Sequence, residues 1–233
     1  MRMKTVGLIG GIGPESTIEY YRFIIEGYRE RISDGSYPPI VINSIDLSKL
    51  VAWMESDQLA EVADYLLAAI EKLAAAKADF IAIAANTPHI VFNQVRTRSP
   101  LPMVSIVEAT RDKASALGLR RLGLFGTRFT MQSQFYPDTF AERQMAIIVP
   151  TTAEQNYIHE KYFAELVKNI FLPETRSHLL AIVDRMKTED AIDGLILGGT
   201  ELPLILRDGG DNQLPFLDTT RIHADAIVRE ILS

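Results

Sequence analysis

The sequence contains no cysteine among its 233 residues. Disulfide bonds, thiolate metal sites and a cysteine nucleophile are therefore excluded, which favours a cytoplasmic protein. The chain also lacks long runs of one charge and any apolar stretch near the ~20 residues that a membrane span needs. Its 24 basic and 30 acidic residues give a net charge of -6, which provides no general attraction to nucleic acid. We expect neither nucleic acid nor a membrane as a partner.

The N-terminus resembles a signal peptide at first sight, because Arg2 and Lys4 precede an apolar run over residues 6–12. Three glycines interrupt this run, Pro14 ends it, and no small-x-small cleavage site follows. We therefore interpret it as a buried first strand.

Short apolar runs alternate along the chain with longer segments of helical periodicity. This alternation is typical of βα units around a mostly parallel sheet. The expected strands cover residues 5–10, 40–44, 80–84, 103–106, 121–125, 146–149 and 194–197. The expected helices cover residues 15–31, 58–76, 88–96, 133–142, parts of 155–187, and 223–232, with 202–206 continuing the alternation.

Two motifs recur in the second half of the chain. V-G-L-I-G-G-I-G-P-E-S-T from Val6 resembles L-G-L-F-G-T-R-F-T-M-Q-S from Leu122, and F-I-A-I-A-A-N-T-P from Phe80 resembles G-L-I-L-G-G-T-E-L-P from Gly194. Both pairs are about 115 residues apart, which indicates duplication, although apolar strands also resemble one another by chance. We predict an α/β protein of two pseudo-symmetric lobes, residues 1–108 with 218–233 and residues 109–217. Each lobe is a small, mostly parallel sheet flanked by helices, with the site in the cleft between them.

The glycine-rich segment from Gly10 to Thr17 follows the first expected strand and opens a helix. Its backbone N–H groups, including that of Gly11, suit an anion, while a tight turn with a helix cap is the structural alternative. The third glycine of a dinucleotide-binding motif is replaced by Ser16, and there is no Walker lysine. We therefore expect neither a dinucleotide nor a nucleoside triphosphate, and no other cofactor.

Polar residues follow three further expected strands, where they can cap a helix or bind a ligand. They are Asn86 and Thr87, then Thr127, Arg128 and Thr130, then Thr200 and Glu201. Arg128 suits a substrate carboxylate, or is a surface arginine. His159, His178 and His223 lack the spacing of metal ligands, so no metal site is predicted.

Together these motifs resemble the aspartate/glutamate racemase family, which includes hydantoin racemase and maleate isomerase relatives. The resemblance is carried by G-G-I-G-P-E-S-T with Glu19-Tyr20-Tyr21, by A-N-T-P-H from Ala85, by G-T-x-x-T-M from Gly126 and by L-G-G-T-E-L-P from Leu197. It implies the two-lobed fold and a cofactor-independent proton exchange between two cysteines, in motifs that usually read C-N-T-x-H and G-C-T-E.

This sequence departs from the family pattern at both cysteines, because Ala85 and Gly199 stand in their places. Neither side chain can carry a proton. The resemblance makes the motif residues His89 and Glu201 the candidate acid–base groups in place of the thiols. It also implies substrate contacts, which with Gly11 from the glycine-rich turn are Asn86, Thr87, Thr127, Thr130, Thr200 and, less securely, Lys168. The loop with Ser44, Asp46 and Lys49 matches too loosely for single roles.

Three functions are compatible with this pattern. The favoured one is a racemase or isomerase of a small acidic amino acid or dicarboxylate that uses non-thiol bases. The second is a lyase or hydrolase with a single base, in which Ala85 and Gly199 leave room for a water or a bulkier substrate. The third is a carboxylate-binding protein without turnover. The resemblance also implies a homodimer, with Trp53 or Tyr65 as candidate interface residues.

Overall fold

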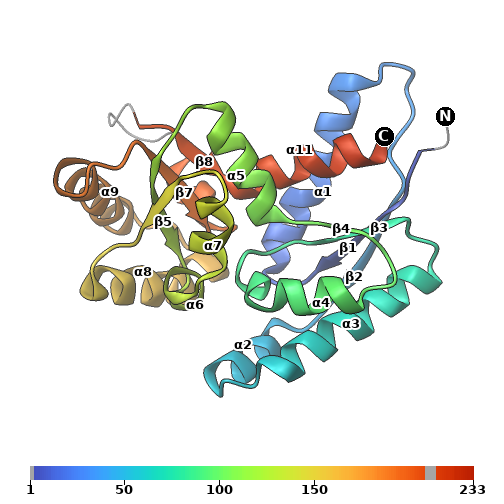
Figure 1. The fold of residues 1–233 in the computed structure, drawn as a ribbon, viewed down its shortest axis with the longest axis horizontal. Coiled ribbons are helices and arrows are strands. Elements are labelled where there is room, and N and C mark those ends of the chain that lie inside the picture. Colours follow the sequence, from blue (N-terminus) through green and yellow to red (C-terminus); the bar gives the residue numbers. More distant parts are fainter. Residues whose placement is uncertain (1–2, 208–213) are drawn as a thin grey trace. The chain divides into compact units, whose positions relative to one another are not determined.

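The computed structural model describes residues 3–207 and 214–233. The lobe assignment of residues 1–2 and 208–213 lies outside this range. The chain divides into two compact units, one of Met1–Ala109 with Thr220–Ser233 and one of Thr110–Thr219 (Figure 1). The boundaries fall within helix α5 (Ile106–Ala116) and at the start of helix α11 (Thr219–Ile231).

The first unit contains a four-stranded parallel sheet in the order β2-β1-β3-β4. The strands are β1 (Val6–Gly10), β2 (Ile40–Ser44), β3 (Phe80–Ile83) and β4 (Met103–Val104). Every residue of β1 and β3 is buried, which is why both read as continuous apolar runs rather than alternating ones.

Helices cover both faces of this sheet (Figure 1). Helices α1 (Pro14–Arg31) and α11 pack on the face that presents Val6 and Leu8. Helix α3 (Leu59–Ala75) packs on the other face, where Leu73 approaches Gly7. The remaining elements of this unit are α2 (Leu47–Glu55), the 3-10 helix η1 (Thr87–Val91) and α4 (Phe92–Arg98).

The second unit repeats this topology with the order β6-β5-β7-β8, again all parallel. Its strands are β5 (Arg121–Gly126), β6 (Ala146–Ile148), β7 (Gly194–Gly198) and β8 (Phe216–Asp218). Its helices are α6 (Arg128–Gln132), α7 (Phe135–Ala141), α8 (Thr152–Ala164), η2 (Leu166–Lys168), α9 (Pro173–Glu189) and α10 (Leu202–Leu206). The repeated motifs form the two central strands of each sheet, so the predicted α/β class with two pseudo-symmetric lobes is confirmed.

Several predicted boundaries were wrong for local reasons. The strand predicted over 103–106 ends at Val104, because the Ser105 hydroxyl accepts from the backbone N–H of Glu108 at 3.3 Å and starts α5. The helix predicted over 88–96 is a 3-10 turn followed by α4. Helix α2 was not predicted, although Asp46 caps it by accepting from the N–H of Ser48 at 2.8 Å. Helix α6 and strand β8 were also missed.

Among the described residues, no helix is long and apolar enough to cross a membrane.

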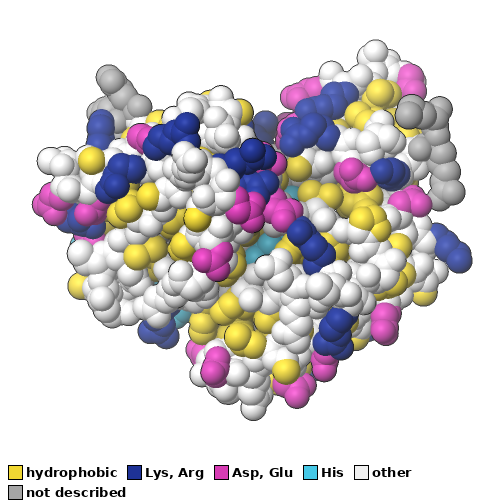
Figure 2. Space-filling view, in the orientation of Figure 1, with side chains coloured by type: hydrophobic (Ala, Val, Ile, Leu, Met, Phe, Trp, Pro, Cys, Tyr) yellow, Lys and Arg dark blue, Asp and Glu magenta, His cyan; other side chains and the backbone are white. Residues whose placement is uncertain are grey.

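On the face drawn in Figure 2, basic and acidic side chains lie interspersed over each unit. Several are paired, as Arg98 is with Asp64 at 2.7 Å and Lys4 with Glu230 at 2.6 Å.

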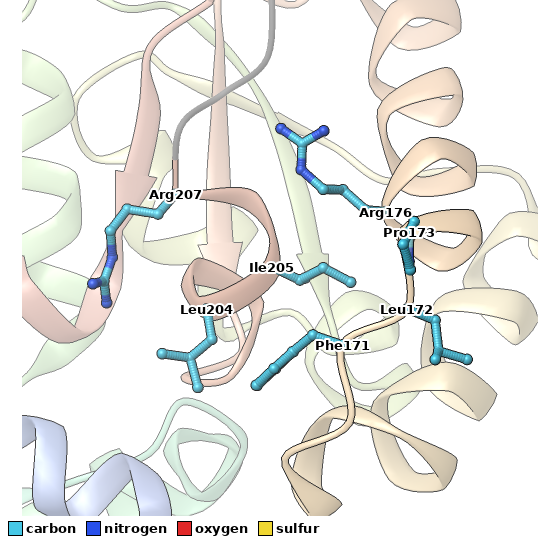
Figure 3. A pocket seen from close by; sticks show the side chains of 7 residues that line it. All are labelled: Phe171, Leu172, Pro173, Arg176, Leu204, Ile205 and Arg207. Carbon is cyan, nitrogen blue, oxygen red and sulfur yellow. The ribbon is translucent and has the colours of Figure 1, made fainter.

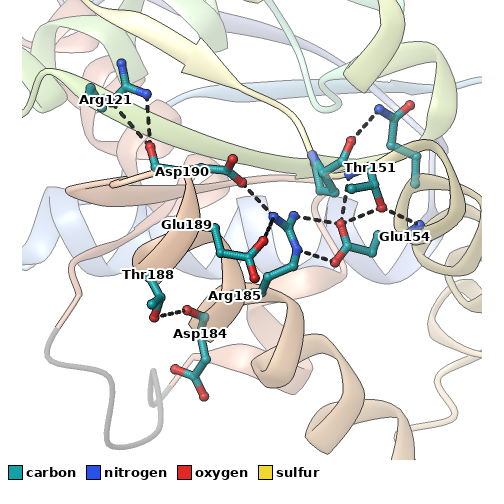
Figure 4. Close-up of polar contacts among 10 residues, drawn as sticks. Arg121, Thr151, Glu154, Asp184, Arg185, Thr188, Glu189 and Asp190 are labelled. Carbon is teal, nitrogen blue, oxygen red and sulfur yellow. Dashed lines mark hydrogen bonds and ion pairs between the residues drawn. The ribbon is translucent and has the colours of Figure 1, made fainter.

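Arg185 of α9 holds the start of α8 (Figure 4). Its Nε and Nη2 atoms donate to both carboxylate oxygens of Glu154, at 2.6 and 2.7 Å, and Nη1 donates to Asp190 at 2.9 Å. Glu154 also closes a capping box with Thr151, the N-cap of α8. Burial alone would raise the pKa of Glu154, but hydrogen bonds from Arg185 and Thr151 outweigh it and hold that pKa below its usual value.

We expect Arg185→Met to lower the free energy of unfolding at pH 7 by about 2 kcal/mol, because it removes charge-assisted hydrogen bonds to a half-buried carboxylate. Because the pKa of Glu154 is lowered in the folded state, its ionised carboxylate stabilises the folded protein at pH values above the unfolded pKa near ~4.3. This contribution is lost as the pH falls through the pKa of the folded state, so the difference in unfolding free energy between parent and variant should shrink below about pH 4. Urea denaturation at several pH values measures this difference. Arg98→Met, which breaks an exposed pair, is the control and should cost under about 1 kcal/mol.

A buried histidine links three elements of the first unit. The Tyr20 hydroxyl donates to Nδ1 of His223 at 2.8 Å, and Nε2–H of His223 donates to the Val104 carbonyl at 3.0 Å. These partners fix the tautomer, because a carbonyl only accepts. Burial lowers the pKa of His223 to about 4, so the ring is neutral at pH 7.

The protein should lose stability as the pH falls below 6.5, because the unfolded chain then protonates His223 and the folded chain does not until about pH 4. The loss from this residue amounts to about 1.4 kcal/mol per pH unit. His223→Gln should therefore be less stable at pH 7.5 but should lose about 2 kcal/mol less than the parent on going to pH 5. Urea denaturation at both pH values measures the difference. His178→Gln, an exposed position on α9, is the control; equal pH slopes for all three proteins would contradict the assignment.

Candidate functional site

Each unit places two of the motif turns side by side at the carboxyl edge of its sheet. In the first unit β1 and β3 are paired neighbours, so the turn after Gly10 and the turn from Ala84 lie at one edge. In the second unit Gly126 and Gly198 are partners at the ends of β5 and β7. Ligands of open α/β sheets bind at this edge. Each pair of turns is therefore a candidate half-site.

The glycine-rich turn is closed by its own residues. The Gly11 N–H donates to the Thr17 hydroxyl at 2.9 Å, and that hydroxyl donates to the Gly13 carbonyl at 3.2 Å. Gly11 has a φ of +81°, and a Cβ there would lie 2.3 Å from the carbonyl oxygen of Ile45. Its N–H is thus engaged within the turn, and the glycine is needed for the close approach of the loop after β2.

The turn after β3 buries Ala85, Asn86 and His89, with Thr87 half-buried. Nδ1–H of His89 donates to the carbonyl of Ala85 at 3.0 Å, which leaves Nε2 as the lone-pair nitrogen. That Nε2 is buried and has no hydrogen-bond partner among the described residues. An unpartnered buried acceptor is unusual and points to a function or a ligand.

Burial is the main cause that lowers the pKa of His89, to about 3, and nearby His223 and Arg96 lower it further. The hydrogen bond to Ala85 opposes this shift but does not outweigh it. The ring stacks on Phe92, with centroids 4.6 Å apart, and Arg96 lies over the same phenyl ring at 4.4 Å. His89 is therefore a neutral, oriented imidazole at pH 7.

In the second unit the turn after β5 places its hydroxyls inward. The hydroxyl of Thr127 accepts from the N–H of Thr130 at 3.2 Å and lies 3.2 Å from the Thr130 hydroxyl, and both side chains are buried. Thr127 thus caps α6. Arg128 is half-buried, and its backbone N–H donates to Nδ1 of His159 at 3.2 Å.

The turn after β7 places Thr200 and Glu201 in the interior, with Glu201 1% exposed. The Thr200 hydroxyl donates to Oε2 of Glu201 at 3.0 Å, and the hydroxyl of Tyr162 donates to the same oxygen. Tyr162 comes from α8 and is also buried. Burial first, and then the charge of Glu201, raise the pKa of Tyr162 well above its usual value, so the phenol stays protonated.

Gly199 does not leave an empty space. A Cβ on Gly199 would lie 2.5 Å from Cε2 of Tyr162, so the tyrosine ring fills the volume beside it. The expectation that Gly199 leaves room for a water or a larger substrate is therefore wrong. Tyr162 is the site residue that sequence reasoning missed, because no local spacing relates it to Gly199.

The less secure candidates have exposed side chains. Lys168 ends η2 and is exposed. Ser44, Asp46 and Lys49 are also exposed; the Lys49 ammonium lies 6.0 Å from the centre of the Tyr65 ring. Within the described residues, no group of three His, Asp or Glu side chains is placed to hold a metal ion.

A cavity of about 490 Å³ lies in the second unit between α10 and the segment that leads into α9. It is lined by Phe171, Leu172, Pro173, Arg176, Leu204, Ile205 and Arg207. Figure 3 shows Ile205 and Phe171 pointing into the space between the two segments, whereas Arg207 points away from it. The lining contains none of the candidate residues, so we assign the chemistry to the turns and not to this cavity.

Comparisons with known proteins agree with the fold and with these motifs. The family model described as Asp/Glu/Hydantoin racemase matches residues 9–227. The broad specificity amino-acid racemase RacX of Bacillus subtilis is 24% identical over 98% of both chains.

Two solved structures are similar over nearly the whole chain. An aspartate racemase homologue from Pyrococcus horikoshii is 32% identical with a TM-score of 0.85, over 99% of this chain and 100% of its own. A candidate Asp/Glu racemase from Yersinia pestis is 29% identical with a TM-score of 0.89 over the same shares. The chain therefore belongs to the Asp/Glu/hydantoin racemase family and is a racemase-type isomerase by descent.

Proposed function

We propose that the protein is a cofactor-independent racemase or isomerase of a small acidic amino acid or dicarboxylate, with oxygen and nitrogen bases in place of two thiols. The observation that carries this proposal is that each unit holds a buried titratable side chain in the turn whose cysteine is missing. These are His89, four residues after Ala85, and Glu201, two residues after Gly199. Racemisation needs two acid–base groups on opposite faces of the substrate α-carbon, and we assign those roles to this pair.

In one direction, Nε2 of His89 removes the α-proton, and the electron pair of the broken C–H bond stays on the α-carbon and the adjacent carboxylate. The protonated carboxyl of Glu201 then returns a proton to the other face. In the other direction Glu201 takes the proton and the imidazolium gives it back. Nε2 suits this role because it is oriented by Nδ1 and has no partner among the described residues.

The lowered pKa of His89 belongs to a site without substrate. A bound carboxylate brings negative charge that favours the imidazolium, so it raises the basicity of the ring. A dicarboxylate does this more strongly than a neutral amino acid. This argument supports an acidic substrate.

The remaining candidates are proposed to hold the substrate. Asn86, Thr87, Thr127, Thr130 and Thr200 offer amide and hydroxyl groups around the turns. Gly11 shapes its turn, and Lys168 or Arg128 supplies a cation for a carboxylate. The cytoplasmic location and the homodimer expected from the sequence are also part of this proposal.

Incubation with L- and D-aspartate, L- and D-glutamate and other amino acids in heavy water tests the reaction, with α-deuterium followed by NMR. We expect deuterated product of inverted configuration from at least one acidic substrate. His89→Asn keeps a donor for the Ala85 carbonyl but loses the base, and Glu201→Gln keeps the shape. Each should lower turnover about 10²–10⁴-fold.

Glu174→Gln, at an exposed position in the first turn of α9, is the control and should leave turnover unchanged. A thermal-shift series should show that the variants still bind the substrate. Exchange with retained configuration would indicate single-base chemistry. Thermal stabilisation without exchange across the panel would leave a binding protein and refute the proposed function.

A further inference from the structure

At residue 199 a neighbouring side chain, and not the backbone conformation, leaves no room for a Cβ. A Cβ on Gly199 would lie 2.5 Å from Cε2 of Tyr162 and 3.2 Å from both Cζ and the hydroxyl oxygen. The φ of Gly199 is outside the left-handed region, so an L-residue would fit the local backbone. The three heavy atoms nearest to that Cβ all belong to Tyr162, so the tyrosine ring is what a larger residue would meet first.

The ring of Tyr162 is held from several directions. It is buried, meets Phe163 edge-on at 5.5 Å between centroids, and its hydroxyl donates to Glu201. The helix that carries it is fixed at its start by the capping box of Thr151 and Glu154. A side chain at residue 199 would therefore push against a ring that has little freedom to move.

We propose that Tyr162 takes the place of the second thiol, with its ring in the volume of the missing side chain and its hydroxyl positioning the carboxylate of Glu201. The inference has a steric half, that the ring fills the volume of the missing side chain, and a functional half, that the hydroxyl positions Glu201. The functional half rests on the proposed function, while the steric half does not. Tyr162 acts through Glu201, so it is a positioning residue and not itself the base.

The phenol is suited to this task because it remains a donor. Its raised pKa, caused first by burial and then by Glu201, keeps the proton on the hydroxyl throughout the neutral range. Together with the Thr200 hydroxyl it supplies two donors to one oxygen of Glu201. Two donors to one oxygen fix the orientation of this carboxylate.

A double-mutant cycle on thermal stability tests the steric half. Gly199→Ala should lower Tm by about 5 °C in the parent, because the new Cβ overpacks against the ring. In a Tyr162→Ala background the same change should cost nothing measurable or raise Tm. In a Tyr162→Phe background it should cost as much as in the parent, because the ring is still present.

The control for the glycine change is Gly27→Ala in α1, where a Cβ meets its nearest neighbour at 3.4 Å and Tm should not fall. If Gly199→Ala does not fold alone, the comparison of Tyr162→Ala with the double variant still decides the point. An equal loss from Gly199→Ala with and without the ring would overturn the steric assignment.

The positioning role is tested without any activity, by the ¹³C chemical shift of the Glu201 carboxyl carbon at neutral pH in labelled protein, assigned with Glu201→Gln. Tyr162→Phe removes one hydrogen-bond donor from this carboxylate, so the resonance should move measurably from its position in the parent. Tyr157→Phe, on the same helix with its ring stacked on His178 at 4.0 Å, is the matched control and should keep the parent resonance. A Glu201 resonance that is the same in both phenylalanine variants would overturn the role.

In the direction in which Glu201 takes the α-proton, Tyr162→Phe should lower kcat about 10-fold with KM little changed, whereas Tyr157→Phe should leave kcat unchanged. If the parent protein exchanges no α-proton, the proposed function fails while the chemical shift of the Glu201 carboxyl carbon still decides the role of Tyr162. If the parent turns over and Tyr162→Phe keeps both kcat and the Glu201 resonance, only the inference about Tyr162 fails.

Discussion

The contact between the Tyr162 ring and the backbone of Gly199 is the constraint on which the candidate chemistry of the second unit depends. It places the phenol within hydrogen-bonding reach of the buried carboxylate of Glu201. The helix that carries the ring, α8, is fixed at its start by a capping box in which Arg185 donates a hydrogen bond to Glu154. An ion pair at one end of the helix thus supports a hydrogen bond near the other.

The first unit has the same topology, but the polar side chains that follow its strands are different. There the polar group after the strand is an imidazole whose Nδ1 is satisfied by the carbonyl of Ala85, and whose Nε2 is not satisfied by the described residues. In the second unit the carboxylate of Glu201 has two hydroxyl donors. The repeated fold therefore holds one buried imidazole and one buried carboxylate, in environments that differ in hydrogen bonding.

The sequence predicted the central strands well, because a strand buried on both faces is a continuous apolar run, as in β3 and β7. Short elements were harder: α2 depends on the Asp46 cap, and the end of β4 depends on Ser105. The motif turns were located correctly as segments, since each follows such a strand. Tyr162 could not be found, because its contact with Gly199 depends on how α8 packs against β5, the neighbour of β7 in the sheet.

Because the chain has no cysteine, the proposed site makes a particular demand on its substrate. A thiol has a pKa near ~8.5 and can gain or lose a proton near neutral pH with modest help. His89 starts from a pKa of about 3 because burial disfavours its charged form, so it is a weak base until an anion arrives beside it. In the proposed reaction the substrate must therefore contribute part of the negative charge that stabilises the imidazolium. A ligand with a second carboxylate contributes more than one without, and this dependence links the absence of cysteine to the preference for acidic substrates that we propose.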